Sequence, residues 1–192
     1  MAQNEPANNG AKQLIWAVFA VLVALLLLGA FNLYGGYDVA ADQPHSAPAL
    51  WLANTARTNS VSARAKDIAL PAGFGSDAQV KAGASEYAEM CSQCHLAPGA
   101  ERSEISQGLY PRAPELAKGN ALTPEEQFWV VKHGIKMTGM PAWGVTHDDK
   151  LIWSIVAFIQ KLPTLSTDEY KMMTKDAAEE HEEMKDMPGM NK

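Results

Sequence analysis

Hydrophobic positions are distributed unevenly along the chain, and the longest apolar run lies near its N-terminus. Residues 14–31 are all apolar or small and carry no charge, and a bilayer core needs about 20 such residues. The pattern predicts one transmembrane helix over residues 14–34, preceded by a short segment, 1–13. Lys12 precedes the run and Asp38 is the first charge beyond it, which favours a cytoplasmic N-terminus.

A cleavable signal peptide is the alternative for this segment. Val39-Ala40-Ala41 offers the small residues that a signal peptidase accepts. However, the apolar run exceeds the usual core of about 7–15 residues, and Ala41 lies well beyond its end. An uncleaved anchor is therefore favoured, although the sequence leaves cleavage open. Both interpretations place the rest of the chain outside the cytoplasm.

Residues 35–76 change character and are predicted to form a linker that contains a membrane-proximal helix. The helix, 49–68, has three cations and no acid between Arg57 and Lys66. One interpretation lays it against the anionic membrane surface with Trp51 at the interface. The other is a connector helix that packs on the following domain, and the weak apolar stripe does not separate the two.

Three helical patterns follow within residues 77–163. The first starts at Ser76 or Asp77 and runs to about Met90. The second begins at Thr123-Pro124, a capping residue followed by a first-turn proline, and ends at Gly134. The third covers residues 147–161 and repeats apolar residues at helical spacing. No segment shows a convincing strand pattern, so the chain is predicted to be all-α.

The two cysteines of the chain, Cys91 and Cys94, are followed at once by His95. A C-x-x-C-H string is typical of covalent c-type haem attachment, since each thiol can add to one vinyl group and the histidine can bind the iron. A redox disulfide is less favoured, because the alternating strands and helices of a thioredoxin-like unit are missing. A zinc site is less favoured because the chain offers no second cysteine pair.

These motifs resemble class I c-type cytochromes in their monohaem, membrane-anchored bacterial form. In that family a helix carrying a glycine and an aromatic residue ahead of C-x-x-C-H crosses a C-terminal helix. Gly83 and Tyr87 match the first helix, and Ile155 and Phe158 match the second. The resemblance implies a cytochrome c haem domain of three or four helices over residues 77–163, with one covalently attached haem c.

The resemblance also implies a second axial ligand. Gly139-Met140-Pro141-Ala142-Trp143 is similar to the loop that supplies the distal methionine in this family. Met140 is therefore the predicted distal ligand opposite His95, and His/Met ligation raises the reduction potential. Met137 and His133 are the alternatives.

Residues 96–122 form a long loop that we expect to wrap the haem edge. By analogy, a carbonyl near Pro98 would accept the other ring N–H of His95. Arg102, Tyr110 and Arg112 are possible partners of the haem propionates, with an ordinary surface role as the alternative. Trp129 and Trp143 are expected to be core residues at the faces or rim of the haem.

The net charge of the chain says little about function until its distribution along the sequence is considered. The formal net charge is −6, and no basic stripe with interleaved aromatic residues points to nucleic acid. Residues 164–192 form an acidic, methionine-rich tail, predicted as a short helix from Thr167 and then disorder. Its thioethers and His181 could hold Cu(I), but a solvated acidic tail is the favoured interpretation.

The expected function is single-electron transfer by Fe(II)/Fe(III) cycling between respiratory-chain components, and no enzyme activity is expected. The protein would sit in the bacterial inner membrane by one helix, with the haem domain facing the periplasm and redox proteins as partners. A fixed subunit of a terminal oxidase or dehydrogenase complex is the main alternative. A haem sensor or a copper-handling protein is a further one. The sequence names neither the electron donor nor the acceptor.

Overall fold

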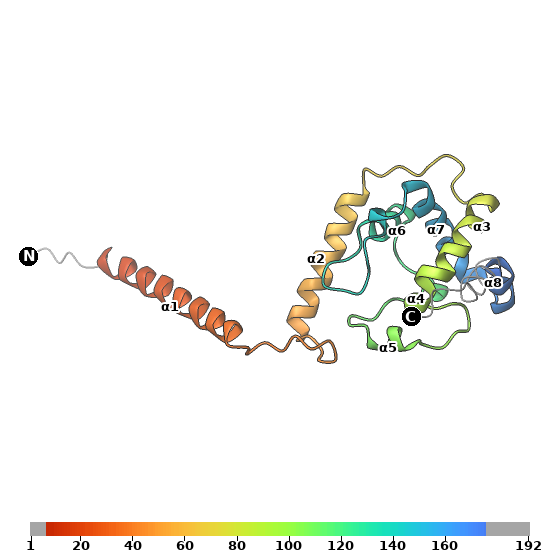
Figure 1. Cartoon of the computed structure of the whole chain (residues 1–192). Helices are drawn as coiled ribbons and strands as arrows, with labels where there is room; N and C mark the ends of the chain where they lie inside the picture. The colour runs from red at the N-terminus through yellow and green to blue at the C-terminus, as the bar shows by residue number, and fades with distance from the viewer. Residues whose placement is uncertain (1–6, 176–192) are drawn as a thin grey trace, which may run out of the picture. The chain divides into compact units, whose positions relative to one another are not determined.

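The structure is a computed structural model that describes residues 7–175 (Figure 1). The described part of the chain divides into two compact units between Gln43 and Pro44. Within it all regular elements are helices and no residue is in a strand, which confirms the predicted all-α class.

The first unit contains α1 (Ala7–Leu33). Its apolar side chains are almost all exposed. Residues Asn9–Leu33 are long and apolar enough to cross a membrane, and no other helix in the described residues meets that test. The predicted anchor is therefore supported by length and composition. The helix begins earlier than residue 14, where the pattern placed its start.

The second unit contains the remaining elements. Three helices of ten residues or more cover much of the predicted haem domain: α3 (Asp77–Glu86), α6 (Pro124–His133) and α7 (Asp149–Lys161). The others are α2 (Ala47–Ala65), a π-helical turn η1 (Tyr87–Cys91), α4 (Ser92–His95), α5 (Glu104–Gly108), α8 (Thr167–Met173), and the 3₁₀ turns η2 (Leu116–Lys118), η3 (Trp143–Val145) and η4 (Leu162–Thr164).

Local capping chemistry sets the ends of these helices. The Thr123 hydroxyl accepts from the Glu126 backbone N–H at 3.3 Å, and the Glu126 carboxylate accepts from the Thr123 N–H at 3.0 Å. This reciprocal pair satisfies two donors that the first turn of α6 would leave open. Asp148 caps α7 by accepting from the Leu151 N–H at 2.8 Å. Gly134 ends α6 with φ +64°, as predicted.

The crossing of α3 and α7 is the central packing interaction of the unit. A Cβ on Gly83 would lie 1.9 Å from the Ser154 carbonyl oxygen, so only glycine allows this approach. One turn further on, the fully buried Tyr87 ring packs against Phe158, with ring centroids 5.3 Å apart. The predicted pairing of the two helices is confirmed. Tyr170 of α8 adds a third ring, 6.4 Å from Tyr87.

The helical register changes just before the cysteine motif. The sequence pattern treats residues 77–90 as one α-helix that carries Gly83, Tyr87 and Cys91 on a single face. In the structure α3 ends at Glu86 and the next turn, Tyr87–Cys91, is π-helical. Such a turn bonds i to i+5 and inserts one residue, so Cys91 is rotated away from strict i, i+4, i+8 spacing.

Helix α2 packs against α6, as the connector interpretation expected (Figure 1). Val61 and Ala65 are buried, with 4 % and 3 % of their surfaces exposed. The Ser62 hydroxyl donates to the Glu126 carboxylate, which ties α2 to the first turn of α6. Trp51 at the other end of α2 is exposed. The start of a separate haem domain at residue 77 stays a prediction, because α2 belongs to the same compact unit.

Substitution of Gly83 by alanine tests the helix crossing. Alanine has the higher helix propensity, yet its methyl group would overlap the α7 backbone. We expect Gly83→Ala to lower the free energy of unfolding by about 2 kcal/mol or more, measured by denaturant unfolding of the holoprotein. Gly108→Ala is the matched control, since its Cβ would meet nothing within 4 Å. Equal stability of the two variants would contradict the packing described here.

Candidate functional site

A mostly apolar cavity of about 500 Å³ lies in the second unit. It falls within the range of about 300–1,000 Å³ that is common for pockets that bind small molecules. Apolar side chains of α6 and α7 and of the long loop between residues 96 and 122 form most of its walls, among them Leu109, Leu116, Val130, Val131 and Ile159. The loop therefore contributes to the walls of the cavity, and its predicted course around a haem edge stays a prediction.

Three of the predicted site residues reach the cavity from η1 and α4. Cys91, Cys94 and His95 all line it. Burial, with smaller contributions from nearby Cys94 and Glu86, raises the pKa of the Cys91 thiol to about 12. Catalytic redox cysteines have lowered thiol pKa values, so the shift at Cys91 is opposite to that expected of a redox disulfide.

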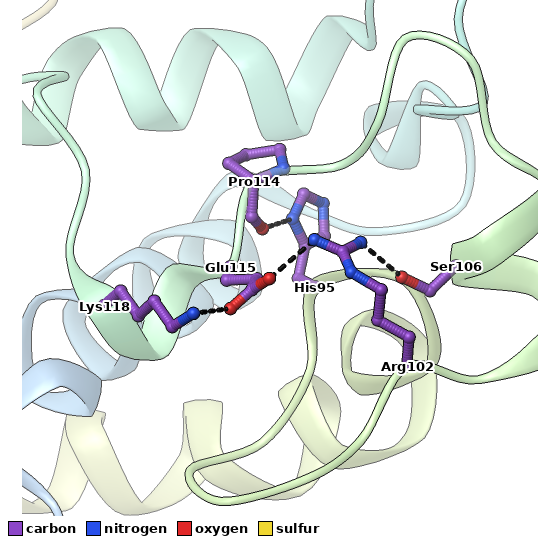
Figure 2. Close-up of polar contacts among 6 residues, drawn as sticks. All are labelled: His95, Arg102, Ser106, Pro114, Glu115 and Lys118. Atoms are coloured by element: carbon purple, nitrogen blue, oxygen red, sulfur yellow. Dashed lines mark hydrogen bonds and ion pairs between the residues drawn. The ribbon is translucent and has the colours of Figure 1, made fainter.

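The ring of His95 is oriented by a backbone carbonyl. Its Nδ1 lies 2.9 Å from the Pro114 oxygen (Figure 2), which leaves Nε2 available to a ligand. The suggested acceptor near Pro98 is wrong, because the ring nitrogen bonds to the Pro114 carbonyl instead. The Pro98 carbonyl accepts from the Thr167 hydroxyl at 3.1 Å. The chain folds back between residues 96 and 114, so proximity in sequence does not identify the partner. Burial lowers the pKa of His95, an effect partly offset by this bond.

A charged cluster lies beside this bond. The Glu115 carboxylate, next to Pro114 in the chain, pairs with both Arg102 and Lys118 (Figure 2). The Arg102 guanidinium also donates to the Ser106 hydroxyl at 3.2 Å. The hydrogen bond from Lys118, with the charges of Lys118 and Arg102, lowers the pKa of Glu115. These contacts fix the segment whose carbonyl orients His95.

The turn after the motif is held by Tyr87, the first residue of η1. Leu96 has φ +65°, an unusual value for a residue with a side chain. Its carbonyl accepts a hydrogen bond of 2.7 Å from the buried Tyr87 hydroxyl. Tyr87 therefore serves two purposes, since its ring packs in the helix crossing and its hydroxyl secures the chain that leaves His95.

Met140 reaches the same cavity from the loop after α6. Its N–H donates to the Thr138 hydroxyl at 3.1 Å, and that hydroxyl donates to the Ile135 carbonyl at 2.8 Å. The two alternatives for the distal ligand do not line the cavity. Met137 is 93 % exposed, and His133 packs its ring against Trp129.

The three residues suggested as propionate partners differ in where the structure places them. Arg112 lines the cavity, but Arg102 pairs with Glu115 instead. The Tyr110 hydroxyl accepts from the His45 N–H at 2.9 Å. Arg57 of α2 also lines the cavity, and sequence reasoning missed it because it had no means of bringing α2 to this pocket.

The two tryptophans differ in position. Trp143 lines the cavity, as expected of a residue at the haem rim. Trp129 is half-buried outside it. The tryptophan in the core is Trp153, which stacks on Phe128 with ring centroids 4.2 Å apart.

The residues present fit a c-type haem. Two thiols, an oriented imidazole and a thioether share one cavity with apolar walls, which is the donor set of a covalently attached, His/Met-ligated haem. The Gln127 side chain also lines the cavity, and its Oε1 has no hydrogen-bond partner in the described residues. Within residues 7–175 no cluster of three or more His, Cys, Asp or Glu side chains could hold a metal ion instead.

An all-helical unit with these groups in one cavity defines a c-type cytochrome domain. Residues 78–159 match the family model described as cytochrome c oxidase, cbb3-type, subunit III. This part of the chain is a c-type cytochrome domain, a class that transfers electrons and binds haem c covalently. No curated protein and no solved structure was found to match the chain.

The copper hypothesis concerns residues that mostly lie outside the described part of the chain. His181 and the last three tail methionines belong to residues 176–192. Within the described part, α8 confirms the predicted short helix from Thr167. Met172 on this helix is exposed, and Met173 packs against the core.

The hydrogen bond from Tyr87 to Leu96 leads to a testable prediction. Tyr87→Phe keeps the ring but leaves the Leu96 carbonyl without its partner, so we expect a loss of about 1–2 kcal/mol in the free energy of unfolding. Tyr34→Phe is the control, since that side chain is 91 % exposed, and should change stability little. Denaturant unfolding of both holoproteins measures the difference. A Tyr87→Phe variant as stable as the control would show that the bond is unimportant.

Proposed function

We propose that this protein is a membrane-anchored monohaem c-type cytochrome that carries single electrons between components of a respiratory chain. One observation carries the proposal. Cys91, Cys94, His95 and Met140, which are separated by up to 49 positions in the sequence, all line one cavity.

Each residue has a distinct role in the proposal. Cys91 and Cys94 would hold the haem by thioether bonds, His95 would bind the iron through Nε2, and Met140 would bind it from the other side. When bound there, a His/Met-ligated haem c supplies reversible one-electron exchange between Fe(II) and Fe(III). Both axial positions would then be filled, which fits an electron carrier better than oxygen or peroxide chemistry.

The protein around these ligands orients them and excludes water. The Pro114 carbonyl fixes the His95 ring, and the Thr138 hydroxyl holds the backbone of Met140. Apolar walls from α6 and α7 lower the local dielectric, which disfavours the more highly charged state of a bound redox centre. The fixed ligands would keep the geometry similar in the two redox states, and the apolar walls would favour the less charged state.

Helix α1 would confine the domain to a membrane. Its length and composition suit one crossing, and we infer an inner-membrane location with the domain on the periplasmic side. This orientation follows from the charge distribution around the helix and from the need to attach haem c outside the cytoplasm.

A fixed subunit of a terminal oxidase or dehydrogenase complex is the second candidate. The match of residues 78–159 to a family described as an oxidase subunit favours it. The same haem site would serve either role, because only the permanence of the partner differs.

Met140 and Met137 form a matched pair for testing the ligand assignment. The wild-type holoprotein should hold one haem covalently, give a low-spin spectrum and show no change on adding carbon monoxide to the reduced form. Met140→Ala should bind carbon monoxide and have a lower reduction potential, because it loses the thioether ligand. Met137→Ala should behave as wild type, since that side chain is exposed.

The opposite pattern would reassign the ligand. A wild-type protein whose spectrum responds to carbon monoxide would favour a ligand sensor. A wild-type protein without covalently held haem would overturn the proposed function entirely.

Purification in mild detergent should separate the two functional candidates. A mobile carrier is expected to elute alone from size exclusion at the size of the 20.8 kDa chain plus detergent. A fixed subunit is expected to elute with other redox subunits in constant ratio. Constant co-elution across several detergents would contradict the mobile-carrier proposal and support the second candidate.

A further inference from the structure

We propose that α2 completes the haem site and that Arg57, on this helix, supplies positive charge to a haem propionate together with Arg112. The inference rests on the proposed haem-binding function. It concerns a helix that lies before the segment 78–159 matched by the family model, so it adds a wall to the site from outside that segment.

Helix α2 packs against the rest of the second unit. Its buried residues Val61 and Ala65 face the body of the unit, and Ser62 bonds to the first turn of α6. Just before the helix, the His45 N–H donates to the Tyr110 hydroxyl at 2.9 Å. The segment is therefore held at both ends, and the loop that it contacts at Tyr110 continues into Pro114, the partner of His95.

Three residues of α2 line the cavity: Arg57, Thr58 and Val61. They are three to four positions apart or adjacent, so one helix face presents them together. Val61 gives that face a buried apolar contact, and Arg57 lies one turn closer to the start of the helix. This arrangement places a guanidinium at a largely apolar wall.

The permanent charges among the residues that line the cavity are all positive. Arg57 and Arg112 are the only lining residues with a permanent charge, and no carboxylate lines the cavity. Neither guanidinium has a hydrogen bond or ion pair with another residue between 7 and 175. Arg64, on the same helix, differs because its guanidinium donates to the Ser60 carbonyl and hydroxyl at 3.1 and 2.8 Å.

A haem fits this asymmetry because it brings two propionate carboxylates. Arg57 and Arg112 are both exposed at the edge of the cavity, so a propionate there would be partly solvated. Guanidinium groups bind carboxylates with two parallel bonds. Arg57 and Arg112, which have no ion-pair partner among the described residues, would each pair with one propionate. The arginine charges would also disfavour the additional positive charge of Fe(III), and so favour the reduced state.

Removal of the Arg57 charge therefore has a predictable sign. In Arg57→Gln the ratio of reduced to oxidised haem at a fixed ambient potential should fall about threefold, an order of magnitude set by one charge in a partly solvated site. The propionate that loses its cation should also have a raised pKa. Because the ferric iron repels its proton, the potential should then fall more steeply with rising pH between about 5 and 7 than in wild type.

The experiment is a redox titration of the full-length holoprotein in detergent at several pH values. Arg64→Gln is the matched control, since it removes the same charge from the same helix outside the cavity. Arg57→Lys should recover most of the wild-type potential, because it keeps the charge. The spectrum of each variant confirms that both axial ligands are in place.

The inference is overturned if Arg57→Gln and Arg64→Gln have the same potential and the same pH dependence. It is also overturned if Arg57→Lys leaves the potential as low as Arg57→Gln does, since charge would then not be the cause. Neither result touches the proposed function, whose failure would be visible in wild type as the absence of covalent haem.

Discussion

The close approach of α3 to α7 at Gly83 is the constraint on which the rest of the second unit depends. It places Tyr87 in the core against Phe158, and from there the Tyr87 hydroxyl holds the turn after His95. The cysteine motif follows α3 in η1 and α4, and it lines the same cavity as Ile159 of α7. The site is thus a consequence of one backbone contact that a methyl group would prevent.

The parts of the cavity around His95 and around Met140, which we propose as its proximal and distal sides, are held by different means. On the proximal side, the Pro114 carbonyl orients His95, and the charged cluster around Glu115 fixes the chain next to it (Figure 2). On the distal side, Met140 lies on a short loop that is tied by Thr138 and starts from Gly134. A Cβ on Gly134 would lie 2.7 Å from the Met140 oxygen, so glycine both ends α6 and makes room for the loop. A rigid proximal side and a compact distal loop suit a centre whose ligands should not move between redox states.

Helix α2 is the first helix of the second unit, and it follows the candidate membrane helix in the sequence. Three of its residues line the cavity, so α2 is part of the wall of the candidate site. Residues 44–76 are therefore more than a connecting segment, because some of them line the cavity. Two of the cations that suggested a membrane surface have different surroundings: Arg57 lines the cavity, whereas Arg64 donates to Ser60 on the same helix.

Local signals in the sequence were sufficient for the helix class, for the ends of α6 and α7, and for selecting Cys91, Cys94, His95 and Met140, which the structure brings to one cavity. The roles of these four residues as haem ligands stay a proposal. Each of these signals depends on neighbouring residues, such as the capping pair Thr123 and Glu126, or on a short motif whose chemistry is specific. Tertiary structure alone decided the partner of His95, the π-helical turn before Cys91 and the place of Arg57 at the cavity. These depend on how segments far apart in the chain meet, and a carbonyl or a guanidinium carries no local pattern that identifies its distant partner.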